Sequence, residues 1–375
     1  ENKLGIKASS TRQVFFNETK VPVEDMLAGR GDGFKIGMNA LNVGRIKLAA
    51  ACLEAQRRVA TLAIQYATER VQFKTPIAQF GAIQQKLAIM ATNTYVSESA
   101  SYRAAFDIEE KIAQLLEQGL SHQEAELKGV EEFAIECSIL KVSVSEKAQD
   151  CTDEGIQIYG GMGFSADAPM EMAWRDARIA RIYEGTNEIN RMLCVGMLLK
   201  KGFKGEIDLM SAATKVGQEL MEGIPKTELS NAFFAEEKSL LQNLKKAMLM
   251  ITGAAVQKFG PKFDKEQQII LALSDILIEI YMIESAILRT EKNCEHFGLD
   301  SQKNQIDMTQ LYLFDAIEKI NSKGKEAIVS FADGAQLKGM IAGLKQYTKY
   351  QNYPNVVALR RNIAATLIEE NKYPF

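Results

Sequence analysis

One carboxylate in this chain has the setting that acid–base chemistry needs. Residues 182–189 read Ile-Tyr-Glu-Gly-Thr-Asn-Glu-Ile and place Glu184 between an aromatic residue and a Gly-Thr pair that can open a helix. A tight, partly apolar turn can make a carboxylate a general base, because burial disfavours its charged form. The same letters also describe a helix start with a solvated glutamate, since Thr and Asn caps beside Glu are common. The motif alone leaves both interpretations open.

Composition describes a globular chain with a large core. The 375 residues are 46% hydrophobic, and a single core rarely grows past about 250 to 300 residues, so we expect two domains. The formal net charge is −3, with basic and acidic residues interspersed. This leaves no strong basic field for a nucleic-acid backbone, and we expect no nucleic-acid partner.

Residues that bind metals are sparse. The five cysteines are widely spaced, without a Cys-x-x-Cys pair, so the sequence predicts neither a disulfide framework nor a zinc site. Only two histidines occur, His122 and His296, each in helix-like sequence among Glu, Gln or Lys. A His-based triad or metal cluster is therefore not expected.

The sequence predicts no transmembrane segment. No apolar run approaches the length of about 18 residues that a spanning helix needs, and no secretory signal is visible. The chain begins with Glu1 and enters directly into alternating sequence, so we expect a fragment of a longer protein. A bacterial cytoplasmic location is our first expectation, and the mitochondrial matrix stays open.

Helices must position the turn around Glu184. Residues 6–23 alternate as strands do and predict a short β segment at the amino terminus. After a glycine-rich turn, apolar residues recur at helical spacing from Phe34 to about Arg70 and from about Ala82 to Leu116. We therefore expect two long amphipathic helices here.

A third helix is marked by its start. Gly119 stops the preceding pattern, and Ser121 with Glu124 forms a capping box. The apolar spacing then continues to Val144 without interruption, which predicts one helix over this stretch. Long helices joined by short turns favour antiparallel neighbours, so we predict a mainly α protein whose residues 31–205 form an up-down four-helix bundle.

Residues 206–375 predict a second helical domain. Its clearest helix has apolar residues at 4,3,4,3,4 spacing from Ile269 to Ile287, and further helices are expected around 240–251 and 356–367. Such stripes are typical of a core, and the steady rhythm is also typical of a coiled-coil-like seam within the domain or to a partner.

A glycine-rich segment at 156–164 has two interpretations. Gly161-x-Gly163-x-x-Ala166 superficially matches a dinucleotide fingerprint, which requires a helix directly afterwards. Pro169 and Asp167 argue against that helix. A helix that ends at Gly160-Gly161, whose bare backbone lets another group approach, is the better account.

Several motifs in one order resemble the carboxyl-terminal half of an acyl-CoA dehydrogenase. The resemblance covers residues 1–200, and the first 30 resemble the last strands of that family's middle β domain. The very-long-chain members, which carry a helical carboxyl-terminal extension, are the most similar. The motifs are Leu41-Asn42-Val43-Gly44-Arg45, Glu69-Arg70-Val71-Gln72-Phe73, Phe80-Gly81-Ala82-Ile83-Gln84, Gly155-Ile156-Gln157-Ile158-Tyr159-Gly160-Gly161-Met162-Gly163, Arg175-Asp176-Ala177-Arg178 and 182–189.

The resemblance implies a reaction. Glu184 would remove the α-proton of an acyl-CoA while a hydride leaves the β-carbon for FAD, giving a trans-2-enoyl-CoA in fatty acid β-oxidation. An electron-transferring flavoprotein would then accept the electrons. Two alternatives stay open: an acyl-CoA oxidase-like flavoenzyme, and a non-catalytic helical dimerisation module if these residues are the whole protein.

The resemblance also assigns the substrate side. Some family members carry the base at the position of Gly44, which has no carboxylate here, so Glu184 remains the candidate. Asn42 and Arg45 would contact acyl-CoA, and Tyr183 and Gly185 flank the base. Asn42 with Gly44 suggests a roomy acyl channel and long chains.

The remaining motif residues would hold FAD, some of them across a subunit boundary. Such a split cofactor implies a homodimer. Lys74-Thr75 stands where the family has a glycine-bearing sequence, which leaves the geometry of that turn open. The implied cofactor-binding residues are Arg70, Gln72, Phe73, Phe80, Gly81, Gln157, Gly160, Gly161, Thr186 and Glu188.

Overall fold

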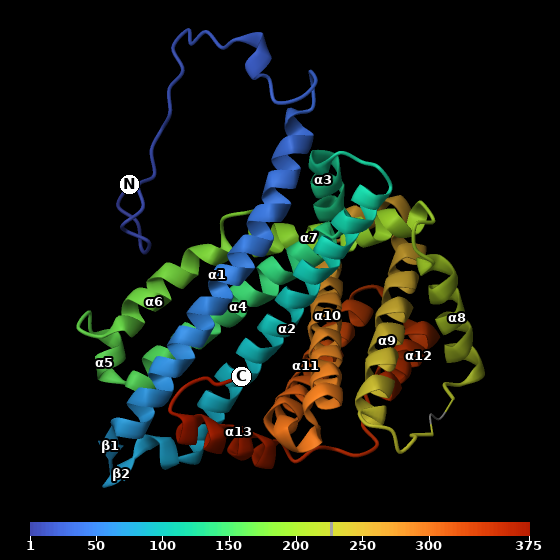
Figure 1. Ribbon diagram of the computed structural model, residues 1–375. Helices are drawn as coiled ribbons and strands as arrows, with labels where there is room; N and C mark the ends of the chain where they lie inside the picture. Colours follow the sequence, from blue (N-terminus) through green and yellow to red (C-terminus); the bar gives the residue numbers. More distant parts are fainter. Residues whose placement is uncertain (226–227) are drawn as a thin grey trace.

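The computed structural model describes residues 1–225 and 228–375 and confirms a mainly α fold (Figure 1). The first helical part contains α1 (Gly33–Glu69), α2 (Gly81–Glu117), α3 (His122–Glu132), α4 (Ala134–Tyr159), α5 (Gly161–Phe164), α6 (Pro169–Ala177) and α7 (Asn187–Phe203). The second contains α8 (Leu209–Glu222), α9 (Ala235–Phe259), α10 (Gln267–Phe297), α11 (Lys303–Phe331), α12 (Gly334–Tyr347) and α13 (Val356–Glu370). Short 3₁₀ helices lie at Val23–Asp25, Ile77–Gln79, Arg178–Arg181, Gly260–Lys265 and Leu299–Gln302.

Helices α1, α2, α4 and α7 form an up-down bundle. The amide of Gln56 donates to the carbonyl of Val144, and the Tyr66 and Tyr159 rings stack further along, so α1 and α4 run parallel. Lys86 pairs with Glu154 across the start of α2 and the end of α4, which makes those two antiparallel. The bundle therefore alternates direction along the chain, as short connections favour.

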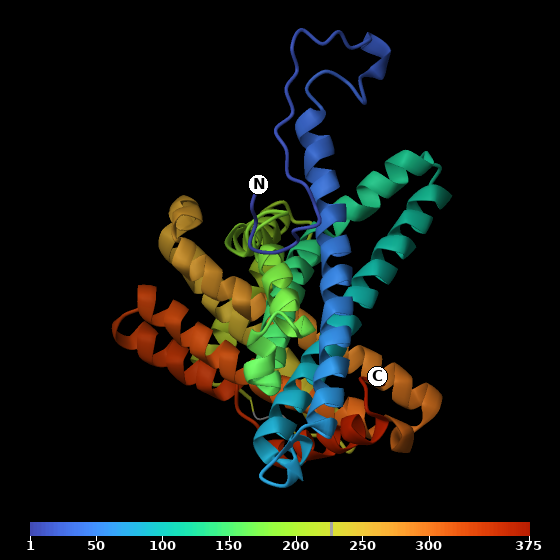
Figure 2. The ribbon, with the colours of Figure 1, turned by 90° about the vertical axis from the view of Figure 1, so that its left-hand side faces the viewer.

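The third predicted helix is broken into two. Phe133, with φ −100° and ψ 26°, interrupts the helix between α3 and α4. The prediction of one helix was wrong because the apolar spacing continues across a break of a single residue. Figure 2 shows that α3 and the end of α2 project together from the bundle. Gly129 allows this close pairing, since a Cβ there would lie 2.5 Å from the side chain of Ile112.

The predicted β segment at residues 6–23 is wrong, because these residues form no strand in the described structure. Among the described residues, the strands are β1 (Val71–Gln72) and β2 (Thr75–Pro76), a two-stranded antiparallel pair. Residues 7–30 form an exposed arm that leaves the helices (Figures 1 and 2). The start of the chain touches α6, where Arg175 donates to the carbonyl of Leu4 and Asp176 accepts from the amide of Ile6. A strand needs a neighbour for its backbone hydrogen bonds, and this arm has none in the described chain. Its assignment to a middle β domain stays a prediction.

The second helical part packs directly on the bundle. α10, α11 and α13 contact α2, and α10 also contacts α7. The buried residues of both parts, such as Ile64 of α1 and Ile283 of α10, belong to one continuous hydrophobic cluster. The predicted helices around 240–251, 269–287 and 356–367 correspond to α9, α10 and α13, whereas α8, α11 and α12 had not been predicted. The predicted division at residue 205 falls between α7 and α8 and stays a prediction.

In the described part of the chain, no helix combines the length and the apolar character that crossing a bilayer requires.

Burial along α10 leads to a prediction about stability. Leu273 is fully buried on this helix, so Leu273→Ala should lower the free energy of unfolding by about 2–5 kcal/mol. Leu288 is exposed on the same helix, and Leu288→Ala should change it by less than about 0.5 kcal/mol. Chemical denaturation followed by circular dichroism measures both. Equal losses in the two variants would contradict the burial of Leu273.

Candidate active site

Glu184 lies in a sharp turn between the 3₁₀ helix Arg178–Arg181 and α7. Glu184 and Gly185 both have positive φ, +59° and +83°. A non-glycine residue in this region persists only when its surroundings hold it there. Thr186 then caps α7 by accepting a hydrogen bond from the amide of Ile189, at 3.3 Å. The predicted helix start at Gly-Thr is confirmed, and the turn places Glu184 just before it.

Two buried side chains hold the carbonyls of this turn. Arg45 donates from Nε to the carbonyl oxygen of Glu184 at 3.3 Å and from a guanidinium nitrogen to Asn42 Oδ1 at 2.8 Å. Asn190 donates to the carbonyls of Glu184, Gly185 and Thr186 at 3.3, 2.9 and 3.1 Å. Sequence analysis missed Asn190, although its position four residues after the helix cap was a signal.

The carboxylate of Glu184 rests against Gly44. A Cβ built on Gly44 would lie 2.6 Å from Oε2 and 2.9 Å from Oε1 of Glu184. Any other residue at 44 would therefore displace the carboxylate or be displaced by it. The two positions face the same volume, so the chain can carry one acidic group there, and it carries Glu184. Within the described residues this carboxylate has no hydrogen-bond partner, which leaves it available to a ligand.

The other predicted site residues gather at the far end of the bundle. Arg70, Gln72 and Phe73 lie on or beside the β1–β2 hairpin, where Phe73 is 88% exposed and packs edge-on against Phe80. Gly81 opens α2 beside them. Phe73 and Lys74 both have positive φ, as in a type I′ turn, so the hairpin forms without the family's glycine.

The end of α4 belongs to the same group. Gln157 lies in its last turn, and Gly160 ends it with φ +60° and no atom within 4 Å of a Cβ position. Gly161 opens α5 and is equally uncrowded. The stacked rings of Tyr66 and Tyr159, 4.0 Å apart, tie this end to α1. The prediction that α4 ends at Gly160-Gly161 is confirmed.

These placements divide the predicted residues into two groups. The Glu184 group comprises Asn42, Arg45, Tyr183, Glu184, Gly185, Thr186 and Glu188, and the hairpin group comprises Arg70, Gln72, Phe73, Phe80, Gly81, Gln157, Gly160 and Gly161. Along α1, Gly44 and Glu69 are about 38 Å apart at 1.5 Å per residue. One cofactor molecule cannot touch both groups of a single chain.

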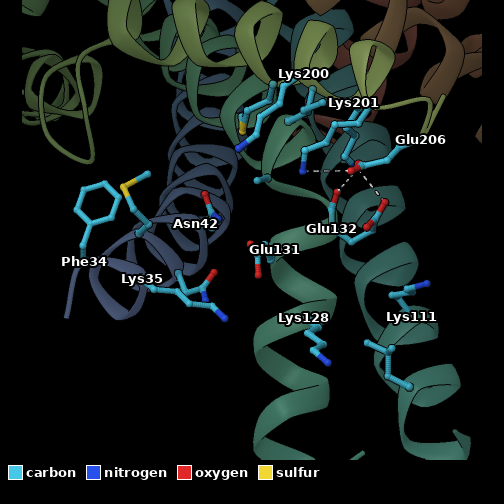
Figure 3. A pocket seen from close by; sticks show the side chains of 17 residues that line it. Phe34, Lys35, Asn42, Lys111, Lys128, Glu131, Glu132, Lys200, Lys201 and Glu206 are labelled. Atoms are coloured by element: carbon cyan, nitrogen blue, oxygen red, sulfur yellow. Dashed lines mark hydrogen bonds and ion pairs between the residues drawn. The ribbon is translucent and has the colours of Figure 1, made fainter. Parts of the chain in front are cut away.

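A basic pocket of about 640 Å³ begins at Asn42 (Figure 3). Its walls come from α1, α2, α3 and α7, and Phe34, Met38 and Leu115 supply apolar surface. In the described structure, Lys201 pairs with Glu132 and Lys204 with Glu206, while the other lysines of the wall make no ion pair. The unpaired ones are Lys35, Lys111, Lys128 and Lys200.

A buried lysine supports the helix that follows Glu184. Lys141 of α4 donates from Nζ to Asn187 Oδ1 at 2.6 Å, and Asn187 is the first residue of α7. Burial, the largest cause, lowers the pKa of Lys141 to about 8, while the carboxylate of Glu188 opposes that shift. Burial also lowers the pKa of Arg45. Cationic groups thus lie behind the turn, inside the bundle.

Two protein-family models match the sequence of this chain. One described as "Acyl-CoA dehydrogenase, C-terminal domain" matches residues 31–198, and a second with the same description matches 243–346. The chain belongs to the acyl-CoA dehydrogenase family. It aligns over its whole length with a Bacillus subtilis (strain 168) protein named "Probable acyl-CoA dehydrogenase", at 39% identity over 373 residues. It covers 62% of that relative.

Solved structures and more distant relatives extend the comparison. A Bacillus anthracis acyl-CoA dehydrogenase complexed with FAD matches all of this chain with a TM-score of 0.97 and 40% identity, over 64% of that protein. The human mitochondrial very long-chain specific acyl-CoA dehydrogenase is 33% identical over 315 residues, which is 78% of this chain and 45% of that protein. Yarrowia lipolytica acyl-CoA oxidase 3, at 17% identity and TM-score 0.64, shares the fold. The chain thus spans less than two thirds of the first relatives it matches.

The burial of Lys141 predicts a pH dependence of stability. Its pKa in the folded state, about 8, lies below the ordinary 10.5, so the unfolded chain binds more protons between these values. The contribution of Lys141 to stability should therefore rise as pH increases from about 8 to about 10.5. Denaturant unfolding at several pH values should show the wild type gaining on Lys141→Met across this interval. Lys325→Met, at an exposed position on α11, should show a flat difference, and a flat curve for Lys141→Met would contradict the prediction.

Proposed function

We propose that this chain is the carboxyl-terminal part of an FAD-dependent acyl-CoA dehydrogenase in which Glu184 is the base. The carboxylate would take the α-proton of an acyl-CoA thioester and so begin its conversion to the trans-2-enoyl-CoA of β-oxidation. The observation that carries this proposal is the contact between Glu184 and Gly44. Arg45 and Asn190 hold the strained turn. This turn places the carboxylate of Glu184, which has no hydrogen-bond partner in the described structure, against Gly44 of α1, where there is no side chain.

The turn can also serve the charge that proton removal creates. Loss of an α-proton builds negative charge on the thioester oxygen, which positioned N–H donors stabilise. The backbone N–H of Glu184 makes no hydrogen bond within the described structure and would be one such donor. Because Arg45 and Asn190 bind the carbonyls of Glu184, Gly185 and Thr186, the peptide planes that follow this N–H are fixed before substrate arrives.

The basic pocket suits the CoA part of the substrate. Lysines without ion-pair partners can bind phosphate groups. Four such lysines surround the cavity that starts at Asn42 (Figure 3), namely Lys35, Lys111, Lys128 and Lys200. Arg45 links Asn42 directly to the Glu184 turn. The preference for long acyl chains rests on Asn42 and Gly44 by resemblance.

The hairpin group fits FAD. Arg70 is exposed and makes no ion pair in the described structure, so its planar guanidinium is free for a pyrophosphate. The open backbone at Gly160 and Gly161 allows close approach of the adenosine part. FAD, when bound, supplies the acceptor for the hydride that leaves the β-carbon. Because the Glu184 group lies about 38 Å away along α1, we propose that each cofactor is shared by two chains of a homodimer.

The electron acceptor and the location belong to the same proposal. An electron-transferring flavoprotein is the acceptor that the family implies. The alternative of an oxidase is supported only by similarity of fold between this chain and an acyl-CoA oxidase. Hydrogen peroxide released during turnover would identify the oxidase. A bacterial cytoplasmic location stays a prediction.

Glu184→Gln tests the base directly in the full polypeptide that contains this chain. The amide keeps the shape of the side chain but cannot accept a proton, so flavin reduction by acyl-CoA should fall at least about 100-fold. The protein should stay yellow with bound FAD. Anaerobic stopped-flow absorbance measures the reduction, and a near-normal rate in a flavin-loaded variant would refute the base assignment.

Shared cofactor sites predict complementation between two inactive variants. Glu184→Gln damages the Glu184 group, and Arg70→Ala damages the hairpin group of another chain. A mixed dimer contains one site built from both undamaged groups, so co-expressed variants should recover activity that neither has alone. Dual affinity tags isolate the mixed dimer for assay. Absence of recovery in an isolated, folded mixed dimer would contradict the shared site.

A further inference from the structure

A partly buried chain of ion pairs crosses from α10 to the helix that begins beside Glu184. Arg191 of α7 is 13% exposed and lies between two carboxylates. Its Nε donates to Asp275 Oδ1 of α10 at 2.9 Å, and its two terminal nitrogens donate to Glu146 of α4, each at 2.8 Å. In the described structure, all of the hydrogen bonds of this guanidinium therefore go to carboxylates on two other helices.

The same chain continues to the start of α7. Glu146 Oε1 also accepts from Nδ2 of Asn187 at 3.0 Å, and Asn187 directly follows the cap Thr186. Asn187 is buried and also exchanges hydrogen bonds with Ser145. Two side chains, those of Arg191 and Glu146, thus connect Asp275, in the second helical part, to the first residue of α7.

Arg191 stabilises the charged form of Glu146. Burial alone would raise the pKa of Glu146, but the hydrogen bonds and charge of Arg191 lower it to about 2. A guanidinium in a poorly solvated position needs its partners, because removing one leaves the remaining charge uncompensated. Without the negative charge of Asp275, the acceptor that fixes the Nε of Arg191 is weaker, and the bidentate hydrogen bonding of Arg191 to Glu146 loosens.

We propose that Asp275 is a positioning residue for the Glu184 turn, so that α10 of the second helical part sets the geometry of the base. This inference rests on the proposed function of Glu184. Asp275 touches no reacting atom in this scheme. It orients Arg191, which orients Glu146, which fixes the first residue of α7. The second helical part thereby acts on catalysis as well as on stability.

Asp275→Asn in the full polypeptide tests the proposal, with Glu284→Gln as the matched control. Glu284 lies on the same helix and pairs with Arg103 and Lys245, but none of these contacts reaches α7. Asp275→Asn should slow flavin reduction by about 10- to 100-fold, because small misplacements of a reacting group cost that much. The KM for acyl-CoA and the FAD content should change little, and Glu284→Gln should leave the rate near that of the wild type.

Hydrogen–deuterium exchange provides a readout that needs no substrate. Amides of residues 184–190 should exchange faster in Asp275→Asn and at the wild-type rate in Glu284→Gln. Asp275→Glu, which keeps the charge, should restore much of the protection and of the rate. If Asp275→Asn does not fold, Arg191→Lys tests the same link, because an ammonium cannot hold both carboxylates through a fork.

The outcomes separate this inference from the proposed function. Equal rates and equal exchange in Asp275→Asn and Glu284→Gln would overturn the positioning role, provided Glu184→Gln abolishes reduction. If Glu184→Gln reduces flavin normally, the proposed function fails, whatever Asp275 does. Faster exchange at 184–190 with an unchanged reduction rate would also overturn the role of Asp275 in catalysis.

Discussion

The structure depends most on the close approach of the Glu184 turn to α1 at Gly44. The carboxylate occupies the volume that a side chain at 44 would fill, so the absence of a Cβ on one helix makes room for the acid of another segment. The backbone around Glu184 is left-handed, and Arg45 and Asn190 hold its carbonyls. These features form one arrangement: the strained backbone of Glu184, the missing side chain at Gly44, and the buried donors Arg45 and Asn190. Each of them depends on the others.

The length of α1 separates the two ends of the chemistry. Packing against α4 and α2 supports this helix, which carries Gly44 toward one end and the β1–β2 hairpin beyond the other. A chain that built its complete site alone would bring these ends together. This chain instead exposes Phe73 and Arg70 on a hairpin that projects away from its own Glu184. This separation is the basis for the proposal that two chains complete each site.

Local signals explain what could be predicted from the sequence. Periodicity located α1, α2 and α10 because each carries apolar residues at helical spacing, and the capping box at Ser121 marked the start of α3. The break at Phe133 left no trace, since a single residue does not disturb the apolar spacing. The strand pattern at 6–23 misled because alternation reports a side-chain pattern, whereas a strand also requires a hydrogen-bonded neighbour.

Contacts distant in sequence could not be predicted in this way. Gly44 and Glu184 were paired through a family resemblance, but the 2.6 Å approach between them is a tertiary fact. The link from Arg191 to Asp275 spans 84 residues and joins two ordinary-looking charges on amphipathic helices. Nothing in the local sequence distinguishes either from a solvated surface group, and only the fold shows that they face each other.

Ion pairs with little exposure to solvent also join the two helical parts. Glu98 of α2 is buried and lies between Arg57 of α1 and Arg289 of α10. If the second part were removed, Glu98 would lose one of its two cations, and Arg191 would lose Asp275. Hydrophobic surface alone tolerates imperfect partners, whereas a buried charge without its partner costs about 3–5 kcal/mol. These pairs therefore hold α10 in one register against α2 and α7.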